Sequence, residues 1–334
     1  MSDNVIRVAV LDQYHPGIVE TINRGVPPGW EISYAKSRKT EDQTAVLANA
    51  DVAFVMAAPV TGELLGAAPK LKFIQKLGAG VDRLDQDTCK ARGIAVACLA
   101  GGNAIPVAEH AVLLMLATYR RLIEVDRRTR AGEWGKEESR GINRHMDGKR
   151  IGIVGFGAIG RSVAKLLTGF GVDLVYYDPV DVPAEVEREF NAKRLTLEEL
   201  LRTSDIVTLH LPLLPQTKGM IDEKRLRAMK KGAVLINCAR GGLVDEDALY
   251  RVLKDGHLFA AGIDAFANEP PVGSPLLTLD QTIVSPHLAG ATVDNFAKIV
   301  ERAVANTQQY LGGKGLPPKD AVLLPQGAAS VAAK

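Results

Sequence analysis

The chain has 334 residues, of which 46% are apolar and 24% charged, and a formal net charge of +2. These values are typical of a soluble globular protein, and the length allows two domains. A charge this close to neutral gives no reason to expect nucleic acid or an anionic membrane as a partner. No apolar run approaches the roughly 20 residues that span a bilayer. The polar N-terminal residues lead into a first strand and do not resemble a signal peptide.

Three cysteines are present, Cys89, Cys98 and Cys238. Their odd number and their spacing fit neither a disulfide framework nor a metal site. We therefore expect reduced thiols, a cytoplasmic protein and no bound metal.

Residues 1 to about 100 alternate short apolar runs with helical stretches. Strands are expected at 6–11, 30–35, 52–56, 72–77 and 94–97, and helices at 41–49 and 85–92. Such alternation predicts a parallel sheet with helices on its faces. The fourth strand runs into Gly78-Ala79-Gly80, where backbone N–H groups either bind a small anion or form an ordinary turn. The two readings are equally supported.

A long helix is predicted from Pro106 to about Ile123, after a glycine-rich break that marks the crossing into a second domain. His110 lies within this helix and is interpreted as a structural histidine bonded to a backbone group. The arginines between 120 and 130 alternate with acidic residues, which is typical of a solvated helix face with i,i+4 pairs. Residues 131–148 resemble an irregular arm, and its Trp134 suggests a subunit interface.

The strongest motif lies between Lys149 and Asp178. An apolar strand is followed by Gly155-Phe156-Gly157-Ala158-Ile159-Gly160, a helical pattern, a second strand and Asp178. Gly155 permits a tight turn, Gly157 lets the backbone approach a pyrophosphate, and Gly160 lets helix pack closely on strand. The helix N-terminus attracts the phosphates, and Asp178 can accept hydrogen bonds from a ribose. The motif predicts dinucleotide binding. Because Pro179-Val180-Asp181 offers no Arg or Lys for a 2′-phosphate, it favours NAD over NADP.

From Arg150 onward the pattern predicts six strands, the complement of a doubly wound dinucleotide domain. They are expected at 151–154, 172–177, 206–211, 233–237, 259–264 and 282–285. Thr196 and Glu199 form a capping box that opens one of the intervening helices. A last amphipathic helix, Val293–Leu311, is expected to cross back and pack on the first domain.

We therefore predict a substrate domain from residues 1–102 with 293–325 and a nucleotide domain from 103–292. Residues 326–334 are expected to form a disordered tail.

Three polar residues follow the last three predicted strands in turn: Arg240, Glu269 and His287. The carboxyl ends of parallel strands line one crevice, and the glycine-rich loop opens on the same edge. We therefore expect a guanidinium, a carboxylate and an imidazole to converge beside the nicotinamide.

This set of side chains suits hydride transfer to a 2-oxo acid. His287 can give a proton to the developing alkoxide, and Glu269 can stabilise the imidazolium and fix its tautomer. Arg240 can bind the substrate carboxylate through its fork of donors. The N–H groups around Ala79 and Gly80 can hold the other side of that carboxylate.

The sequence resembles the D-isomer-specific 2-hydroxyacid dehydrogenases along nearly its whole length. The matching motifs are LGAGVD (77–82), NAIPVAEHA (103–111), GIVGFGAIGR (152–161), HLPLLPQTKGMID (210–222), INCARGGLVDEDAL (236–249), GIDAFANEP (262–270) and SPHLAGAT (285–292). The resemblance implies Arg240 as the substrate-binding arginine and Glu269 with His287 as the acid–base pair. We expect an α/β fold of two Rossmann-like or flavodoxin-like parallel-sheet domains, with the active site in the cleft between them. Family members usually form dimers through the nucleotide domain, so a homodimer is expected.

The resemblance also implies NAD-binding residues around the glycine-rich loop and beyond it. They are Phe156, Ala158, Ile159, Asp178, His210, Pro212, Thr217, Cys238, Ala239, Asp264, Ala289 and Gly290. Formate dehydrogenases of the superfamily carry Gln where Glu269 stands, which argues against that activity.

The expected pocket wall from Met56 to Val60 is small and apolar, with no Arg or Lys to meet a phosphate. This favours a small substrate of the hydroxypyruvate or glyoxylate type, with D-3-phosphoglycerate as the alternative. A function of another class stays open: an NAD-sensing, corepressor-like binding protein in which nucleotide binding creates a surface for a protein partner.

Overall fold

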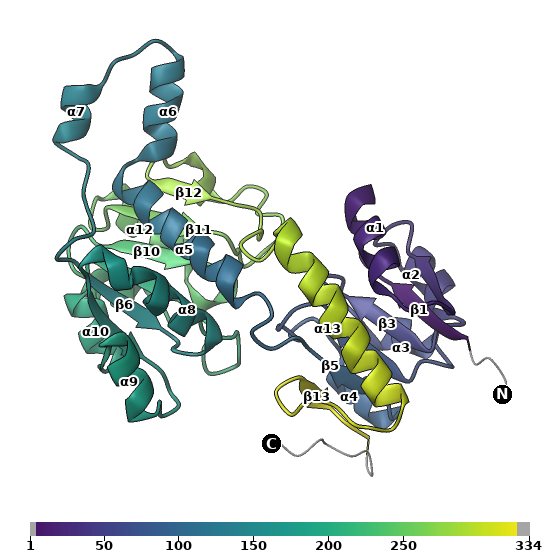
Figure 1. Cartoon of the computed structure of the whole chain (residues 1–334). Helices are drawn as coiled ribbons and strands as arrows, with labels where there is room; N and C mark the ends of the chain where they lie inside the picture. The colour runs from purple at the N-terminus through teal and green to yellow at the C-terminus, as the bar shows by residue number, and fades with distance from the viewer. Residues whose placement is uncertain (1–4, 326–334) are drawn as a thin grey trace. The chain divides into compact units, whose positions relative to one another are not determined.

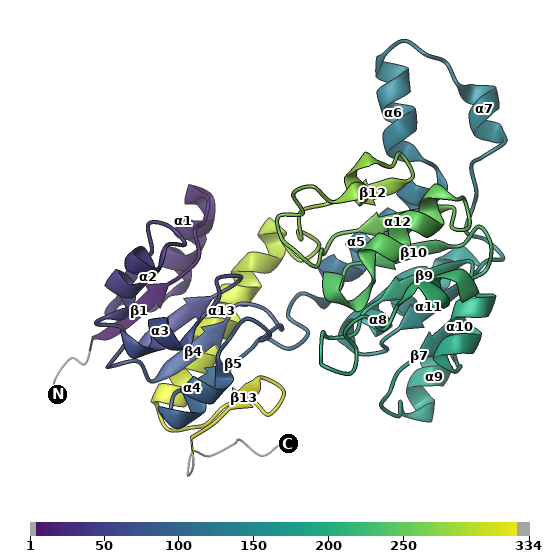
Figure 2. The same ribbon diagram turned by 180° about the vertical axis from the view of Figure 1, so that it is seen from behind.

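The computed structural model describes residues 5–325, and the chain divides into two compact units (Figures 1 and 2). One unit is formed by the described residues up to Asn103 and from Ala291 on, and the other is Ala104–Gly290. The expected disordered tail at 326–334 lies outside the described residues.

The first unit is built around a six-stranded sheet in the order β13-β5-β4-β3-β1-β2. Its strands are β1 (Ile6–Val10), β2 (Trp30–Tyr34), β3 (Val52–Val55), β4 (Phe73–Lys76), β5 (Ala95–Ala97) and β13 (Ala321–Leu323). Strands β1 to β5 pair in parallel, in the order typical of flavodoxin-like sheets. Strand β13 adds to the edge antiparallel to β5. Sequence reasoning missed it because three half-buried residues carry too short a pattern.

Helices cover both faces of this sheet. They are α1 (Pro16–Gly25), α2 (Thr40–Leu47), α3 (Gly62–Gly66), α4 (Gln86–Ala91) and α13 (Val293–Leu311). Helix α13 packs against α1 and β4, and Phe296 and Val300 on its inner face join Phe54 and Phe73 in one apolar cluster. Figure 1 shows α13, in yellow-green, lying across the sheet. The final helix therefore completes the core that the first hundred residues begin.

The second unit contains a seven-stranded parallel sheet in the order β12-β11-β10-β9-β6-β7-β8. Its strands are β6 (Arg150–Val154), β7 (Asp173–Tyr177), β8 (Lys193–Arg194), β9 (Ile206–Leu209), β10 (Val234–Asn237), β11 (Ala260–Ile263) and β12 (Thr282–Val284). The six predicted strands are all present, and the two-residue β8 is additional. Strand order reverses between β6 and β9, which is the point where such sheets bind their ligand.

In the sequence, the helices of this unit alternate with its strands, apart from three helices that precede β6. They are α5 (Ala104–Tyr119), α6 (Leu122–Arg130), α7 (Lys136–Arg140), α8 (Ala158–Leu167), α9 (Ala184–Phe190), α10 (Leu197–Thr203), α11 (Glu223–Ala228) and α12 (Glu246–Lys254). The predicted capping box of Thr196 and Glu199 is confirmed at the start of α10.

The helix predicted at 106–123 is present, but it is interrupted at residues 120–121 and is therefore two helices. Helix α5 ends at Tyr119, and α6 begins at Leu122 after Arg121, whose φ of 47° is left-handed. A left-handed residue interrupts the hydrogen-bond ladder, yet arginine is a good helix former and its periodicity shows no break. Residues 131–148 are not wholly irregular, because they include α7. Figures 1 and 2 show α6 and α7 projecting away from the sheet of their unit.

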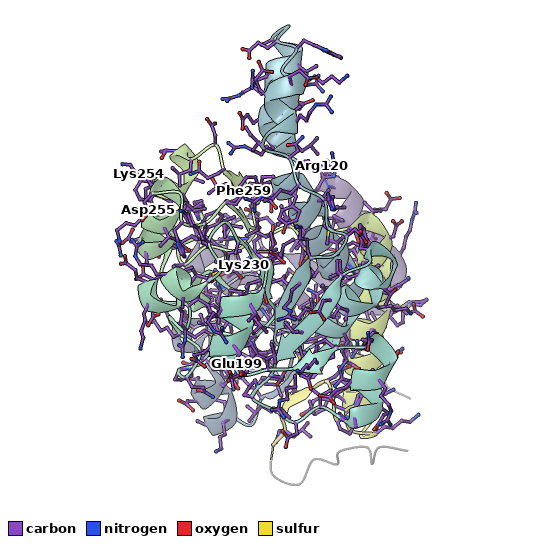
Figure 3. The ribbon with its side chains drawn as sticks, turned by 90° about the vertical axis from the view of Figure 1, so that its left-hand side faces the viewer. Arg120, Glu199, Lys230, Lys254, Asp255 and Phe259 are labelled. Atoms are coloured by element: carbon purple, nitrogen blue, oxygen red, sulfur yellow. The ribbon has the colours of Figure 1, made fainter. Side chains whose placement is uncertain are left out.

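The arginines of α6 pair with nearby acidic residues, as predicted: Arg121 with Glu124 at 2.6 Å and Arg130 with Asp126 at 2.9 Å. Charges of both signs also cover the face of this unit seen in Figure 3, where Glu199, Lys230 and Asp255 are labelled. Within residues 5–325, no helix is both long enough and apolar enough to cross a membrane.

Candidate active site

The glycine-rich loop joins β6 to α8 and requires two of its glycines for steric reasons. Gly155 has a φ of +96°, and a Cβ on it would lie 2.7 Å from the carbonyl carbon of His210. A Cβ on Gly160 would lie 2.1 Å from the carbonyl oxygen of Gly155. Gly157 has open space around it, and α8 has no side-chain cap on its first N–H groups. The loop therefore fits a bound diphosphate.

Asp178 follows β7 and lies against this loop. Its carboxylate accepts hydrogen bonds from the backbone N–H groups of Phe156 at 2.7 Å and Val180 at 2.9 Å. Pro179-Val180-Asp181 offers no Arg or Lys, but a cation lies nearby: Arg194 pairs with Asp181 and donates to the Asp178 carbonyl oxygen at 2.9 Å. Arg194 lies close to Asp178 because the short strand β8 pairs with β7. The sequence pattern did not predict this pairing.

The three predicted catalytic residues follow β10, β11 and β12 in turn, at the carboxyl edge of the sheet. His287 Nδ1 lies 2.7 Å from Glu269 Oε1, with 41% of the imidazole side chain and 20% of the carboxylate side chain exposed. The Phe266 N–H also approaches Glu269 Oε1, at 3.3 Å. The contact occupies Nδ1, so proton exchange with a bound molecule would have to use the other ring nitrogen, Nε2.

The backbone around His287 is held from inside the unit. The His287 N–H donates to the Asp264 carbonyl oxygen at 2.8 Å, and its φ of 52° is left-handed. The buried Asp264 carboxylate accepts hydrogen bonds from Ser285 Oγ at 2.6 Å and from the N–H groups of Leu288 and Ala289 at 2.9 and 3.0 Å. The Asp264 side chain therefore anchors the loop that presents the imidazole.

His110 joins the same network from α5. Its Nε2 lies 3.0 Å from Ser285 Oγ and 3.7 Å from Asp264 Oδ1. The expected partner was a backbone group, and the observed partner is a hydroxyl. Helix α5 packs against β11 and β12, which brings these residues together.

Arg240 lies in the turn between β10 and the 3₁₀ segment Gly241–Leu243. Its carbonyl oxygen accepts a hydrogen bond from Asn237 Nδ2 at 2.9 Å, and its own Nη1 donates to the Ala239 carbonyl oxygen at 2.9 Å. These contacts order the turn that carries the guanidinium.

Beside the nucleotide loop, Cys238 is buried and His210 is half-buried with its Nδ1 atom out of contact with solvent. Burial lowers the pKa of His210 to about 3, so the imidazole stays neutral. Its Nε2 contacts Thr208 Oγ1 at 2.9 Å, whereas its Nδ1 has no partner among the described residues. Burial and then the charge of Asp264 raise the pKa of the Cys238 thiol. Cys238 is therefore a packing residue and not a nucleophile.

The other residues assigned to NAD occupy the loops after β6, β9, β10 and β12 and the start of α8. Thr217 Oγ1 donates to the Pro212 carbonyl oxygen at 2.7 Å and orders the loop after β9. Phe156 is buried and stacks on Tyr176, with ring centroids 4.3 Å apart, so it faces the loop with its backbone. The remaining members lie in the first turn of α8 (Ala158, Ile159), after β10 (Ala239) and after β12 (Ala289, Gly290).

In the first unit, the predicted substrate residues follow β3 (Met56) and β4 (Ala79, Gly80). Lys76 Nζ donates to the Met56 carbonyl oxygen at 2.8 Å, and Arg83 Nη1 lies 3.5 Å from that of Ala57. The Met56–Val60 wall contains no cation of its own, but the fold brings two to it. Of these two cations Lys76 is buried, and the absence of Arg and Lys from the wall does not by itself exclude positive charge from this loop.

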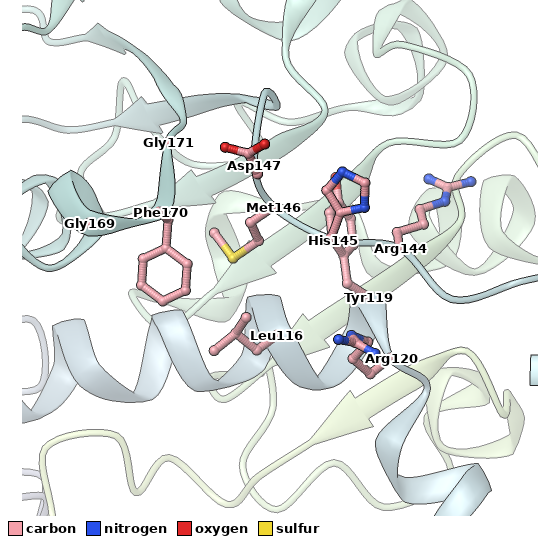
Figure 4. A pocket seen from close by; sticks show the side chains of 10 residues that line it. All are labelled: Leu116, Tyr119, Arg120, Arg144, His145, Met146, Asp147, Gly169, Phe170 and Gly171. Atoms are coloured by element: carbon pink, nitrogen blue, oxygen red, sulfur yellow. The ribbon is translucent and has the colours of Figure 1, made fainter. Parts of the chain in front are cut away.

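A pocket of about 520 Å³ lies elsewhere on the second unit. Figure 4 shows Leu116, Met146 and Phe170 among the side chains that line it. Met146 and Asp147 shortly precede β6, so this pocket lies at the amino edge of the sheet, opposite the edge with the predicted catalytic residues. The pocket is therefore separate from the candidate active site. Within residues 5–325, no group of three or more His, Cys, Asp or Glu side chains is placed to hold a metal ion.

Residues 112–289 match the family model described as D-isomer specific 2-hydroxyacid dehydrogenase, NAD binding domain. The chain belongs to this family. NAD is accordingly its cofactor, which agrees with the open glycine-rich loop of the second unit. The two sheets, whose strands are parallel apart from β13, agree with this assignment as well.

Similar proteins within the family differ in their substrates. The chain is 40% identical to glyoxylate reductase of Thermococcus kodakarensis over 267 residues, which covers 78% of this chain and 79% of that protein. It is 38% identical to D-3-phosphoglycerate dehydrogenase of Mycobacterium leprae over 280 residues, or 83% of this chain and 52% of that protein. The chain thus spans about half the length of the phosphoglycerate dehydrogenase.

Among solved structures, the fold resembles NAD-dependent formate dehydrogenase from Staphylococcus aureus in complex with NAD. The TM-score is 0.83 at 30% identity, and the match covers 95% of this chain and 99% of that one. Three substrates are therefore represented among these relatives, and all three proteins are oxidoreductases.

Proposed function

We propose that this protein is an NAD-dependent D-2-hydroxyacid dehydrogenase acting on a small 2-oxo acid of the hydroxypyruvate or glyoxylate type. The proposal is supported chiefly by the 2.7 Å contact between His287 Nδ1 and Glu269 Oε1 at the carboxyl edge of the nucleotide sheet. The second unit, Ala104–Gly290, binds NAD, and the first unit contributes substrate contacts through Met56, Ala79 and Gly80.

NAD, when bound, supplies the hydride in reduction and accepts it in oxidation. Arg240 binds the substrate carboxylate through two parallel N–H donors and orients the carbonyl group. As the carbonyl carbon is reduced, protonated His287 gives the Nε2 proton to the carbonyl oxygen, and the product is a neutral hydroxyl group. Glu269 orients the imidazole and stabilises its protonated form. In the oxidative direction His287 takes the proton back.

The test is the change in NADH absorbance with a panel of 2-oxo acids: glyoxylate, hydroxypyruvate, pyruvate, 2-oxoglutarate and phenylpyruvate. We expect turnover of hydroxypyruvate or glyoxylate, and a loss of about 10²- to 10⁴-fold in kcat for His287→Asn with NADH affinity unchanged. Tight NADH binding without turnover of any compound would contradict the proposal and favour an NAD-sensing binding protein.

D-3-phosphoglycerate is the second candidate substrate, favoured by the two cations at the Met56–Ala57 carbonyl groups. Lys76 and Arg83 both reach this loop, beside the expected substrate contacts. Oxidation of D-3-phosphoglycerate with NAD, measured in the same assay, distinguishes the candidates. Turnover of the phosphorylated compound alone would establish this second substrate.

We also infer a homodimer formed through the nucleotide unit. Trp134 is 83% exposed on the projecting segment that carries α6 and α7, and Ile123 on α6 is 60% exposed. Large apolar side chains left in water favour association. Sedimentation velocity should show a dimer that Trp134→Glu weakens. The buried thiols also fit the cytoplasm.

A further inference from the structure

Two loops of the candidate active site pack backbone to backbone. Gly241 follows Arg240, and a Cβ on Gly241 would lie 1.9 Å from the carbonyl carbon of Phe266 and 2.0 Å from the nitrogen of Ala267. Glu269 follows these two residues closely in the chain. The absence of a side chain at Gly241 therefore allows two loops to touch directly: the one after β10 that carries Arg240 (the arginine loop) and the one after β11 that carries Glu269 (the glutamate loop).

A second contact joins the same two loops. Glu246 begins α12, six residues after Arg240, and its Oε1 accepts a hydrogen bond from the Ala267 N–H at 2.6 Å. The Glu246 side chain is half-buried, and its pKa is raised above the usual range. Burial is the main cause, opposed by the bond from Ala267 and reinforced by the charges of Asp247 and Glu269.

The adjacent N–H groups of Phe266 and Ala267 thus serve different carboxylates. Phe266 donates to Glu269 Oε1, the atom that contacts His287 Nδ1, and Ala267 donates to Glu246 Oε1. A shift of the backbone at Ala267 would displace the neighbouring Phe266 N–H, which donates to Glu269. It would also displace the chain segment that leads to Glu269. A short bond to a carboxylate is well suited to prevent that shift.

We propose that Glu246 is a positioning residue for the acid–base pair, acting through the Ala267 N–H to hold Glu269 in place against His287. This inference rests on the proposed dehydrogenase function. Glu246 acts through the backbone of Ala267 and is not assigned a step in the reaction. Its hydrogen bond links the start of α12, where the arginine loop ends, to the glutamate loop. The loops that carry Arg240 and Glu269 are therefore held at a fixed distance from each other.

The test compares Glu246→Ala, Glu246→Gln and the matched control Asp247→Ala in the full chain. Asp247 is the next residue of the same helix turn and is exposed. Glu246→Ala should lower kcat about tenfold or more, because small misplacements of catalytic groups are costly, while KM and NADH affinity change less than about twofold. Glu246→Gln should recover most of kcat, because its amide oxygen can accept the same bond. Asp247→Ala should retain wild-type kcat.

Hydrogen exchange at the Ala267 amide supplies a readout that does not need turnover. Exchange should be faster in Glu246→Ala and unchanged in Asp247→Ala. An inactive wild-type protein would defeat the proposed function, and the exchange rates would still test the bond. Should Glu246→Ala fail to fold, Glu246→Asp, whose carboxylate is one methylene shorter, should show the same loss of kcat. Unchanged Ala267 exchange, wild-type kcat in Glu246→Ala, or an equal loss in Glu246→Gln would each overturn the proposal.

Discussion

We expect the carboxylate of Asp178 to decide the choice between NAD and NADP. Asp178→Ala removes the charge that repels a 2′-phosphate and leaves Arg194 beside the same backbone, where it donates to the residue-178 carbonyl oxygen. We therefore expect the preference for NAD over NADP to narrow by about tenfold or more, the effect of roughly 1.4 kcal/mol. The measurement is the ratio of kcat/KM values for the two reduced cofactors.

Arg194→Ala in the Asp178→Ala background serves as the control for this prediction. Removing the guanidinium should reduce the gain with NADPH, because Arg194 is the cation that donates to the residue-178 carbonyl oxygen. An unchanged ratio in Asp178→Ala would place cofactor choice elsewhere in the loop.

We expect the imidazole of His210, whose Nδ1 is buried, to make the fold sensitive to acid. Burial lowers its pKa from the ordinary value of 6.5 to about 3. Between pH 6.5 and pH 3 the unfolded chain binds more protons at this histidine than the folded chain does. The contribution of the neutral imidazole to the free energy of unfolding is therefore largest above pH 6.5 and decreases as the pH falls toward 3. At pH 5 the expected loss is about 2 kcal/mol.

His210→Asn removes this titration. In urea denaturation, the free energy of unfolding of the wild type should fall between pH 7 and pH 5 by about 2 kcal/mol more than that of the variant. Parallel pH dependences of the two proteins would show that His210 is not held neutral by the fold.

At the scale of elements, the β6–α8 turn separates packing from ligand binding. A Cβ on Gly160 would collide with the Gly155 carbonyl oxygen, whereas a Cβ on Gly157 would meet nothing within 4 Å. Gly157 also has a φ of −76°, which any residue adopts. Gly160→Ala should therefore lower the thermal unfolding midpoint and weaken NADH binding together.

Gly157→Ala is the matched variant at the same turn. It should leave the unfolding midpoint within about 2 °C of the wild type, since surface changes usually stay within ±0.5 kcal/mol. Its methyl group would nevertheless occupy the space for a diphosphate, so NADH affinity should fall at least tenfold by our estimate. Normal NADH affinity in Gly157→Ala would remove the loop from the cofactor site.

At the scale of the whole molecule, the two units differ in how their chain segments are arranged. The second unit is one continuous segment, while the first needs α13, whose Phe296, Ile299 and Val300 complete its core. A chain ending at Gly290 should therefore lose the fold of the first unit and keep NADH binding. Intrinsic fluorescence reports the first part, because Trp30 packs against that core.

Trp134→Phe gives a background with Trp30 as the single tryptophan, since the chain has two. In that background the chain ending at Gly290 should show the red-shifted emission of a solvated indole, whereas the full chain should not. A native-like spectrum, or loss of NADH binding in the shorter chain, would contradict the independence of the second unit.

Local patterns along the chain were sufficient for much of the fold and of the candidate site. Hydrophobic periodicity and turn residues, which are properties of neighbouring positions in the sequence, predicted the glycine-rich motif and six of the seven strands around it. They also predicted that Arg240, Glu269 and His287 each follow one of these strands. Helix α13 was likewise predicted at its observed bounds, Val293–Leu311.

Only the tertiary structure decided which distant side chains meet. His110 contacts Ser285 across 175 residues, Glu246 reaches Ala267 across 21, and Arg194 returns to Asp178 across 16. Such contacts depend on strand order, register and the packing of helices on the sheet, none of which leaves a local period. The types of side chain in the candidate site could therefore be predicted from the sequence. The contacts that hold these side chains in place are determined by the packing of the fold.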